Sequence, residues 1–405
     1  MDTTRTFSPR ARWAVPAVAA AAVAAAFVVP ATLGASASDD LPSVSADDLV
    51  DRMANADRVP VSGTVVYTAR LGLPDVTVPE LQGAGPLDLL GGSSTVRVWS
   101  DGEDSSRAAL LGEVSEYSVV RDGPEAWTYS SADDEAVHYV VDPADLERYE
   151  ELSEEAAEPP VDGDLPTPSE AAELALAYAR TTTDVTTTEP VEVAGRAAYQ
   201  LEMRPQTDGT LVDRVRVAVD AETSVPLRAQ VWGVGDDAAP ALEVGFTDVS
   251  FEMPDASVFD FSAPAGADVR EVEVPLPEPG ALEQKHPDAL DGAEGVTVSG
   301  TGWETVVELS DVDVDAILGA AAEGRLPKDG TGSSGADDLL DELSPSDGEM
   351  PALPELDTRA LYEQLTTEVD GGRVLTSALL SVLVTDDGRV LAGSVPPATL
   401  EELAG

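Results

Sequence analysis

The sequence predicts an α+β fold built mainly on an antiparallel sheet, joined to a small C-terminal α+β lobe. Apolar and polar residues alternate over several short segments, as in strands that bury one face and expose the other. The chain has 405 residues, 43% of them apolar, which is enough for more than one core. After Pro275 the composition changes to a Pro- and Glu-rich connector, which separates the lobe from the sheet.

The first elements are a helix and a series of short strands. Ser45 suits the N-cap of a helix over residues 46–56, because Asp47 and Asp48 fall in its first turn. A Gly-, Pro- and Leu-rich loop covers 72–92. The strands of this half are expected at 61–71, 95–100 and 107–112, followed by a meander over 116–141 with turns at 122–123 and 131–134.

An acidic, proline-bearing linker over 150–166 and a short helix over 169–179 precede a second group of strands. These strands are expected at 199–203, 214–220, 227–231 and 241–251. The apolar phase of the last one shifts between Phe246 and Val249, which predicts a β-bulge there.

The C-terminal lobe is expected to mix short helices and strands around a disordered acidic linker. The linker covers 328–357 and is rich in Gly, Ser and Asp. The other elements are a strand at 302–309, helices at 314–323 and 358–367, a hairpin of 373–384 with 389–395 turned at 387–388, and a short final helix.

The N-terminal segment has the pattern of export. Arg5, Arg10 and Arg12 precede an uncharged run from Trp13 to Gly34, and Ala35-Ser36-Ala37 then fits a signal-peptidase site. The run is also about long enough to span a bilayer, so residues 1–37 are either a cleaved signal peptide or a retained membrane anchor. Either reading makes the protein extracytoplasmic. With no cysteine, the chain has no disulfide and no lipid-modified cysteine.

The charge balance excludes several partners. Acidic residues number 77 against 23 basic ones, so the formal net charge is −54. Nucleic acid is therefore excluded as an expected partner, and direct adhesion to an anionic membrane surface is disfavoured. Solubility in a crowded or salty exterior explains the bias, and a high-salt habitat is the alternative.

No catalytic or metal-binding group stands out, so we expect a protein that is not an enzyme and uses no cofactor. His138 and His286 are the only histidines, and neither has metal-ligand spacing. Asp311-x-Asp313-x-Asp315 opens like a calcium loop, but the sixth position is Ala316 and the twelfth is Ala322. A charged turn that caps the following helix is the better interpretation.

Apolar side chains are the remaining candidates for function. Aromatic residues on the expected strands either fill a core or line a cavity of a curved sheet that takes a lipid chain. The 72–92 loop carries Leu81, Leu87, Leu89 and Leu90, and could close such a cavity as a lid. The expected lining residues are Val65, Tyr67, Leu89, Val98, Leu110, Trp127, Tyr129, Leu201, Val217, Val244 and Phe246.

Several motifs resemble the LolA/RseB superfamily, in particular its extracytoplasmic LolA-like members from high-GC Gram-positive bacteria. Residues 118–129 (SVVRDGPEAWTY) are similar to its strand-turn-strand element. The stretch 193–249 contains a Gly-Arg-x-x-Tyr strand and an Asp-x-x-Thr-x-x-Pro-Leu turn over 220–227. Residues 390–403 are similar to the end of RseB-type sigma-factor regulators.

The resemblance implies a half-barrel of antiparallel strands over residues 43–275, with covering helices and an apolar inner side, followed by the lobe over 276–405. LolA carries lipoproteins in such a cavity, and RseB-type members bind an anti-sigma factor. The partners it implies are lipid or lipoprotein acyl chains, or an anti-sigma factor ectodomain. One motif departs: carriers have an Arg-Pro whose arginine latches the lid, where this chain has Asp101-Gly102, with Arg107 only nearby.

Overall fold

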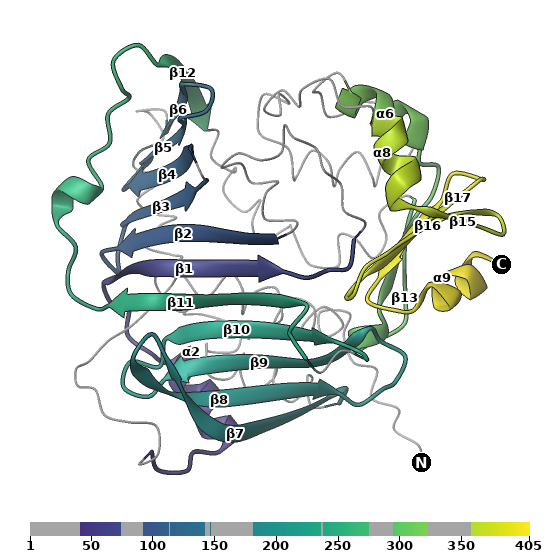
Figure 1. Cartoon of the computed structure of the whole chain (residues 1–405), viewed down its shortest axis with the longest axis horizontal. Helices are drawn as coiled ribbons and strands as arrows, with labels where there is room; N and C mark the ends of the chain where they lie inside the picture. Colours follow the sequence, from purple (N-terminus) through teal and green to yellow (C-terminus); the bar gives the residue numbers. More distant parts are fainter. Residues whose placement is uncertain are drawn as a thin grey trace.

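The computed structural model describes residues 41–73, 92–112, 114–141, 146, 181–235, 238–274, 295–322 and 358–405. They form a twelve-stranded and a six-stranded sheet (Figure 1). The N-terminal segment, the leucines of the expected lid, the 169–179 helix and the acidic linkers all lie outside the described residues.

The larger sheet is formed by the chain between Val61 and Val274. Its strands are β1 (Val61–Ala69), β2 (Gly92–Ser100), β3 (Ser105–Leu111), β4 (Glu116–Asp122), β5 (Glu125–Ser130), β6 (Glu135–Val141), β7 (Thr183–Val193), β8 (Arg196–Pro205), β9 (Val212–Asp220), β10 (Pro226–Gly233), β11 (Leu242–Ser250) and β12 (Asp268–Val274). Their order is β12-β6-β5-β4-β3-β2-β1-β11-β10-β9-β8-β7. All neighbours are antiparallel except β12, which runs parallel to β6. The two groups of strands predicted from the sequence therefore join side by side at β1 and β11.

The predicted β-bulge is confirmed at this junction. Thr64 pairs with Asp248 and Val65 with Phe246, so Thr247 is the extra residue of β11. Gly63 lies beside the bulge, where a Cβ atom would come 2.3 Å from the backbone oxygen of Asp248. The close approach of the two backbones therefore requires glycine at this position.

Replacement of Gly63 by alanine is expected to lower the free energy of unfolding by about 1–3 kcal/mol, because β1 and β11 must move apart to admit the methyl group. Urea-induced unfolding followed by circular dichroism would measure it. Ser62→Ala in the same strand is the control and should be near neutral. Equal stability of the two variants would show that the bulge tolerates a side chain.

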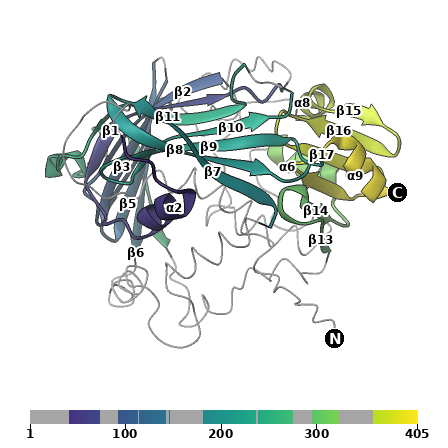
Figure 2. The same cartoon turned by 90° about the horizontal axis from the view of Figure 1, so that it is seen from below.

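The larger sheet curves around the helix α2 (Ala46–Ala54), as Figure 2 shows. The Oγ of Ser45 accepts a hydrogen bond from the Asp48 backbone amide at 3.1 Å, so the predicted N-cap is confirmed. Leu49 of this helix is only 1% exposed and packs among apolar side chains from β1, β2 and β8–β11. We call the side that carries α2 the inner face of the sheet.

Strand pairing assigns each side chain to one face, because paired residues of neighbouring strands point to the same side. Val65 pairs with Phe246 of β11 and Val96 of β2, and Val96 in turn pairs with Leu110 of β3. These residues lie on the inner face. Their neighbours along each strand lie on the opposite, outer face.

The outer face of β3–β6 is covered by the crossing segment, residues 251–267, which contains the 3-10 turn η6 (Ala256–Val258) and leads from β11 to β12 (Figure 1). Phe261 of this segment lies 5.5 Å from Trp127 and 6.0 Å from Tyr129, measured between ring centroids. The outer side chains of Ser118, Val120 and Ala136 are almost fully buried.

The smaller sheet forms the C-terminal lobe, in the order β13-β14-β18-β17-β16-β15. Its strands are β13 (Val296–Ser299), β14 (Val306–Leu309), β15 (Thr367–Val369), β16 (Gly372–Thr376), β17 (Ser381–Thr385) and β18 (Val390–Gly393). The final helix α9 (Pro397–Ala404) contributes Leu400 to a core that includes Val306, Leu383 and Leu391.

Two predictions in the lobe are wrong. Residues 302–304 form the 3-10 turn η8 (Gly302–Glu304), so the strand expected at 302–309 begins only at Val306. The segment expected as one strand over 373–384 is the hairpin β16–β17. Its turn is held by Ser377, whose Oγ accepts a hydrogen bond from the Leu380 amide at 3.0 Å. This turn contains no Gly, Pro or Asn, so the sequence gives no signal that a turn interrupts the expected strand.

Two short helices complete the described lobe. Asp313 precedes the helix α6 (Val314–Ala322), and its Oδ1 accepts a hydrogen bond from the Ala316 amide at 2.9 Å. The charged turn therefore caps this helix. The helix α8 (Thr358–Leu365) contacts α6 through the Thr358 hydroxyl, which donates to the Leu318 carbonyl at 2.8 Å. Among the described residues, no helix is long and apolar enough to cross a membrane.

Candidate functional site

The inner face around α2 is a filled core. Most of the expected cavity-lining residues lie on the inner face, with Leu110 on β3 beyond this core; they are Val65, Tyr67, Val98, Leu110, Leu201, Val217, Val244 and Phe246. All of them are buried except Tyr67, which is half-buried, and this partial burial raises the pKa of the Tyr67 hydroxyl. The free space beside Val65 and Phe246 is about 10 Å³, too small for an acyl chain.

Trp127 and Tyr129 lie on the outer face instead. They share a face, as expected, but Trp127 pairs with His138 and Tyr129 with Ala136, which puts both beneath the crossing segment. The Trp127 and His138 rings stack with 3.9 Å between centroids. The structure therefore does not bring these two aromatics together with the inner residues. Leu89 lies outside the described residues.

The inner face continues beyond α2 onto β3–β6. There Leu110 pairs with Tyr117, and Val119 and Val137 both pair with Thr128. We call these residues, with Tyr139, the inner strip. Val119 is 41% exposed, whereas burial raises the pKa of Tyr117. Among the described residues, none of this strip belongs to the core cluster around Leu49.

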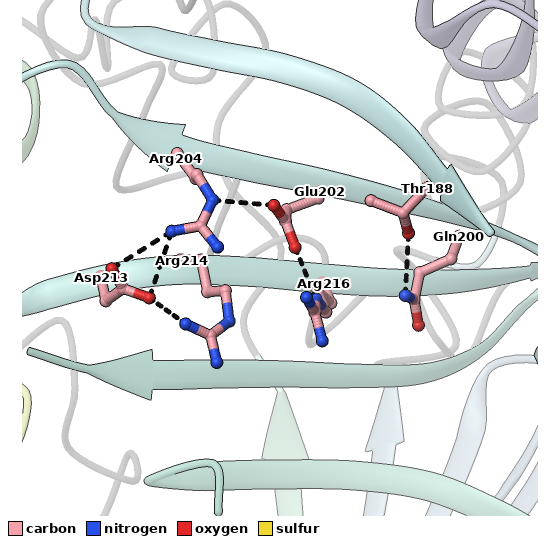
Figure 3. A network of polar contacts seen from close by, with 7 residues as sticks. All are labelled: Thr188, Gln200, Glu202, Arg204, Asp213, Arg214 and Arg216. Carbon is pink, nitrogen blue, oxygen red and sulfur yellow. Dashed lines mark hydrogen bonds and ion pairs between the residues drawn. The ribbon is translucent and has the colours of Figure 1, made fainter. Parts of the chain in front are cut away.

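The outer face of β8–β10 carries a network of charged side chains (Figure 3). Glu202 accepts hydrogen bonds from Arg204 Nε at 2.8 Å and Arg216 Nε at 2.6 Å. Burial raises the pKa of Glu202, but the two arginines together outweigh that effect and hold the pKa below its usual range. Each arginine thus already has a carboxylate partner, and the network joins β8 to β9 as a structural device.

The buried ring of Trp232 extends this network onto β10. The guanidinium of Arg214 lies 4.3 Å from the ring centroid and that of Arg216 lies 5.9 Å from it. Arg214 and Arg204 also both contact the carboxylate of Asp213. Within the described ranges, no group of three or more His, Cys, Asp or Glu side chains could hold a metal ion.

The Asp-x-x-Thr-x-x-Pro-Leu motif forms the connection from β9 to β10. Asp220 is 1% exposed and accepts hydrogen bonds from Arg196 Nε at 2.5 Å and from the amide and hydroxyl of Thr223, both at 2.8 Å. Burial raises the pKa of Asp220, but these donors together outweigh it and hold the pKa below the usual value. The motif therefore stabilises the fold and does not form a reactive site.

The C-terminal lobe contacts the ends of β7, β8 and β9. The buried Trp303 donates its indole N–H to Thr183 Oγ1 at 2.7 Å and packs into the core of the larger sheet. The carbonyl oxygen of Ser394 accepts hydrogen bonds from the Leu211 amide at 2.7 Å and the Thr210 hydroxyl at 2.8 Å. The two sheets are thus joined by an apolar contact flanked by hydrogen bonds.

No family model matches the sequence, and no curated protein matches it. Among solved structures, the chain is similar to MucB in complex with MucA(peri), at 17% identity and a TM-score of 0.39 over 89% of this chain and 97% of that one. A Pseudomonas aeruginosa MucA/MucB complex matches at 19% identity and a TM-score of 0.38 over 89% and 96%.

A LolA superfamily protein from Nitrosomonas europaea is also similar, at 10% identity and a TM-score of 0.19 over 54% of this chain and 99% of that one. The LolA name agrees with the superfamily that the sequence motifs resemble. At these identities and TM-scores, the likenesses say nothing about what this chain binds.

Proposed function

We propose that the protein is a non-catalytic binding protein of the cell envelope, and that its inner strip takes the apolar chain of a lipid or lipoprotein. The observation that carries this proposal is the exposure of the apolar Val119, at 41%, on the same face as the buried Leu110 and Val137. The strip continues the core that surrounds α2 but has no described helix over it.

Physical reasons favour an acyl chain on this surface. The inner face, which carries the strip, is the concave side of the larger sheet (Figure 2). An elongated apolar ligand on this side would therefore contact several strands at once. Each methylene group removed from water stabilises the complex by about 0.8 kcal/mol, and the strip offers the exposed Val119, beside the buried Leu110 and Val137, as its apolar contact. The export pattern of residues 1–37 supports an extracytoplasmic location.

Replacement of Val119 by aspartate is expected to weaken palmitate binding at least tenfold, because the ligand would bury an unpaired carboxylate. Displacement of a fluorescent fatty acid from the delipidated full chain would measure the affinity. Val269→Asp is the matched control: Val269 is 50% exposed on the edge strand β12 of the same sheet but lies on the outer face, where it pairs with Ala136.

The proposal requires that the wild type and the Val269→Asp variant bind equally. A full chain that carries no lipid after mild extraction, and takes up none in the titration, would refute it. Equal loss of binding in both aspartate variants would show a general charge effect and no role for the inner strip.

A regulatory role is the second candidate, in which the C-terminal lobe binds the ectodomain of an anti-sigma factor. The lobe exposes two large apolar side chains, Leu380 at 40% and Leu403 at 42%, which suit a protein partner. Photo-crosslinkers at these two positions of the full chain should capture such an ectodomain, whereas one at Val269 should not. Equal capture at all three positions would count against the lobe.

A further inference from the structure

An open groove of about 420 Å³ lies on the outer face, on the opposite side of the sheet from the inner strip. It runs between β3–β5 and the crossing segment. Its volume is within the range of small-molecule sites. Its lining includes Arg107, Leu111, Glu116, Tyr129 and Phe261.

The polar half of the groove is an arginine–glutamate pair whose hydrogen-bond donors and acceptors are only partly used by the described residues. The hydrogen bonds of Arg107 to other described residues are long, at 3.4 Å to the Val258 carbonyl oxygen and 3.5 Å to Glu116 Oε1, and its guanidinium lies 5.8 Å from the ring centroid of Trp99. Its Nε is buried, with no hydrogen-bond partner among the described residues. Ser118 also donates to Glu116 Oε1, so the described residues engage only one oxygen of this 40% exposed carboxylate. Arg107 therefore has donor capacity, and Glu116 acceptor capacity, that the described residues leave unused.

The other half of the groove is aromatic. The rings of Tyr129 and Phe261 lie 6.0 Å apart at an angle of 42° and form a wall, and Leu111 adds an aliphatic contact. The tyrosine hydroxyl donates to Asp134 at 3.2 Å, which fixes the ring. Such a wall suits a ligand with one flat apolar face.

The charges select among ligands. Arg107 and Glu116 neutralise each other, and the net charge of −54 repels anions from the chain as a whole. An acyl chain would shield the arginine–glutamate pair from water and offer it no new hydrogen bond, which is unfavourable. A neutral ligand with adjacent hydroxyl groups and one apolar face satisfies both halves of the groove.

We propose that this outer groove binds a neutral carbohydrate. A sugar ring packs its C–H face against Tyr129 and Phe261, while adjacent hydroxyl groups donate to Glu116 and accept from Arg107. The site is separate from the inner strip, so the protein can hold a sugar and an apolar chain on opposite faces of one sheet.

Titration of the full chain with the N-acetylglucosamine trimer and with maltotriose, followed by calorimetry, tests this inference. At least one trisaccharide should bind, and Glu116→Gln should weaken it tenfold or more, since the glutamine presents one acceptor fewer. Phe261→Ala should do the same. Glu125→Gln is the control, because Glu125 is 61% exposed on β5 and pairs with His138 outside the groove.

Failure of both sugars to bind, or equal binding by Glu116→Gln and the control, would overturn the inference. Tighter binding of a tetra-alanine peptide than of either sugar would overturn it in favour of a peptide site. Palmitate binding separates the two proposals: Glu116→Gln should leave it unchanged whether or not a sugar binds.

Discussion

Replacement of Asp220 by alanine is expected to lower the free energy of unfolding by about 3 kcal/mol, because it removes the buried carboxylate that binds both Arg196 and Thr223 and leaves Arg196 paired with Glu222 alone. Arg196 donates to both oxygens of Asp220, at 2.5 and 2.9 Å. The same carboxylate accepts from the amide and hydroxyl of Thr223. One substitution therefore removes the ion pair and frees the turn between β9 and β10.

Urea-induced unfolding of the full chain, followed by tryptophan fluorescence, would measure this loss. Asp248→Ala is the control, since Asp248 is exposed on the neighbouring strand β11, and it should change stability by less than about 0.5 kcal/mol. Asp220→Asn keeps the shape but removes the charge, so its effect should fall between the two. An alanine variant as stable as the control would disprove the structural role of the motif.

The contribution of Asp220 to the free energy of unfolding depends on pH. The folded pKa of Asp220 is below the ordinary value, so its contribution to stability is complete above about pH 4, where the carboxyl is ionised in both states. The contribution is lost as the pH falls through the folded pKa. The stability difference between the wild type and Asp220→Asn should therefore shrink as the pH falls below about 4. A difference that grows on acidification would contradict the assignment.

The alternation of apolar residues predicted most of the larger sheet, because alternate residues of a strand point to the same face. Val215, Val217 and Val219 all lie buried on the inner face, as their spacing indicates. The phase shift after Phe246 predicted the bulge for the same reason.

Edge strands escaped prediction because their sequences do not look like buried strands. β7 is rich in threonine and contains Pro190, and it pairs on one side only, with β8. β12 is highly charged and follows a long crossing segment. Its parallel pairing with β6 depends on where that segment ends, which no local pattern reveals.

The candidate site could be predicted only in part. Alternation shows that Trp127 and Tyr129 share a face, but only the pairing of β5 with β4 and β6 shows that it is the outer one. Periodicity also cannot distinguish a filled core from a cavity. Leu49 shares one core with Val65 and Val98, which come from distant parts of the chain, and this packing decides that the inner face around α2 is filled.

No pattern in the sequence predicted that Trp303 is buried in the core of the larger sheet. It lies in a short 3-10 turn between β13 and β14, where no periodic pattern exists, yet it is 8% exposed and packs into the core of the other sheet. The turn is possible because Gly302 adopts a φ of +59°, and a Cβ atom there would come 2.9 Å from the side chain of Thr182. A contact between two lobes thus depends on a glycine–tryptophan pair.

Replacement of Trp303 by alanine is expected to lower the free energy of unfolding by about 3–5 kcal/mol, through the loss of a large buried ring. Trp303→Phe keeps most of the apolar volume and removes the hydrogen bond to Thr183, so its effect should be about 1–3 kcal/mol, since the Thr183 hydroxyl loses its partner. Urea-induced unfolding of both variants would rank them.

The position of Trp303 also predicts where the alanine variant should loosen. Two backbone amides cross between the sheets: Leu211 donates to the Ser394 carbonyl, and Ala378 donates to the Leu71 carbonyl, both at 2.7 Å. Without the Trp303 ring, the sheets keep these bonds, the Thr207–Glu304 hydrogen bond and the packing of Leu379, so both amides become more open to water. Hydrogen exchange at both amides should therefore accelerate much more than at Val217, which lies within the larger sheet. Equal acceleration at all three amides would mean that the ring stabilises the whole chain and does not specifically join its lobes.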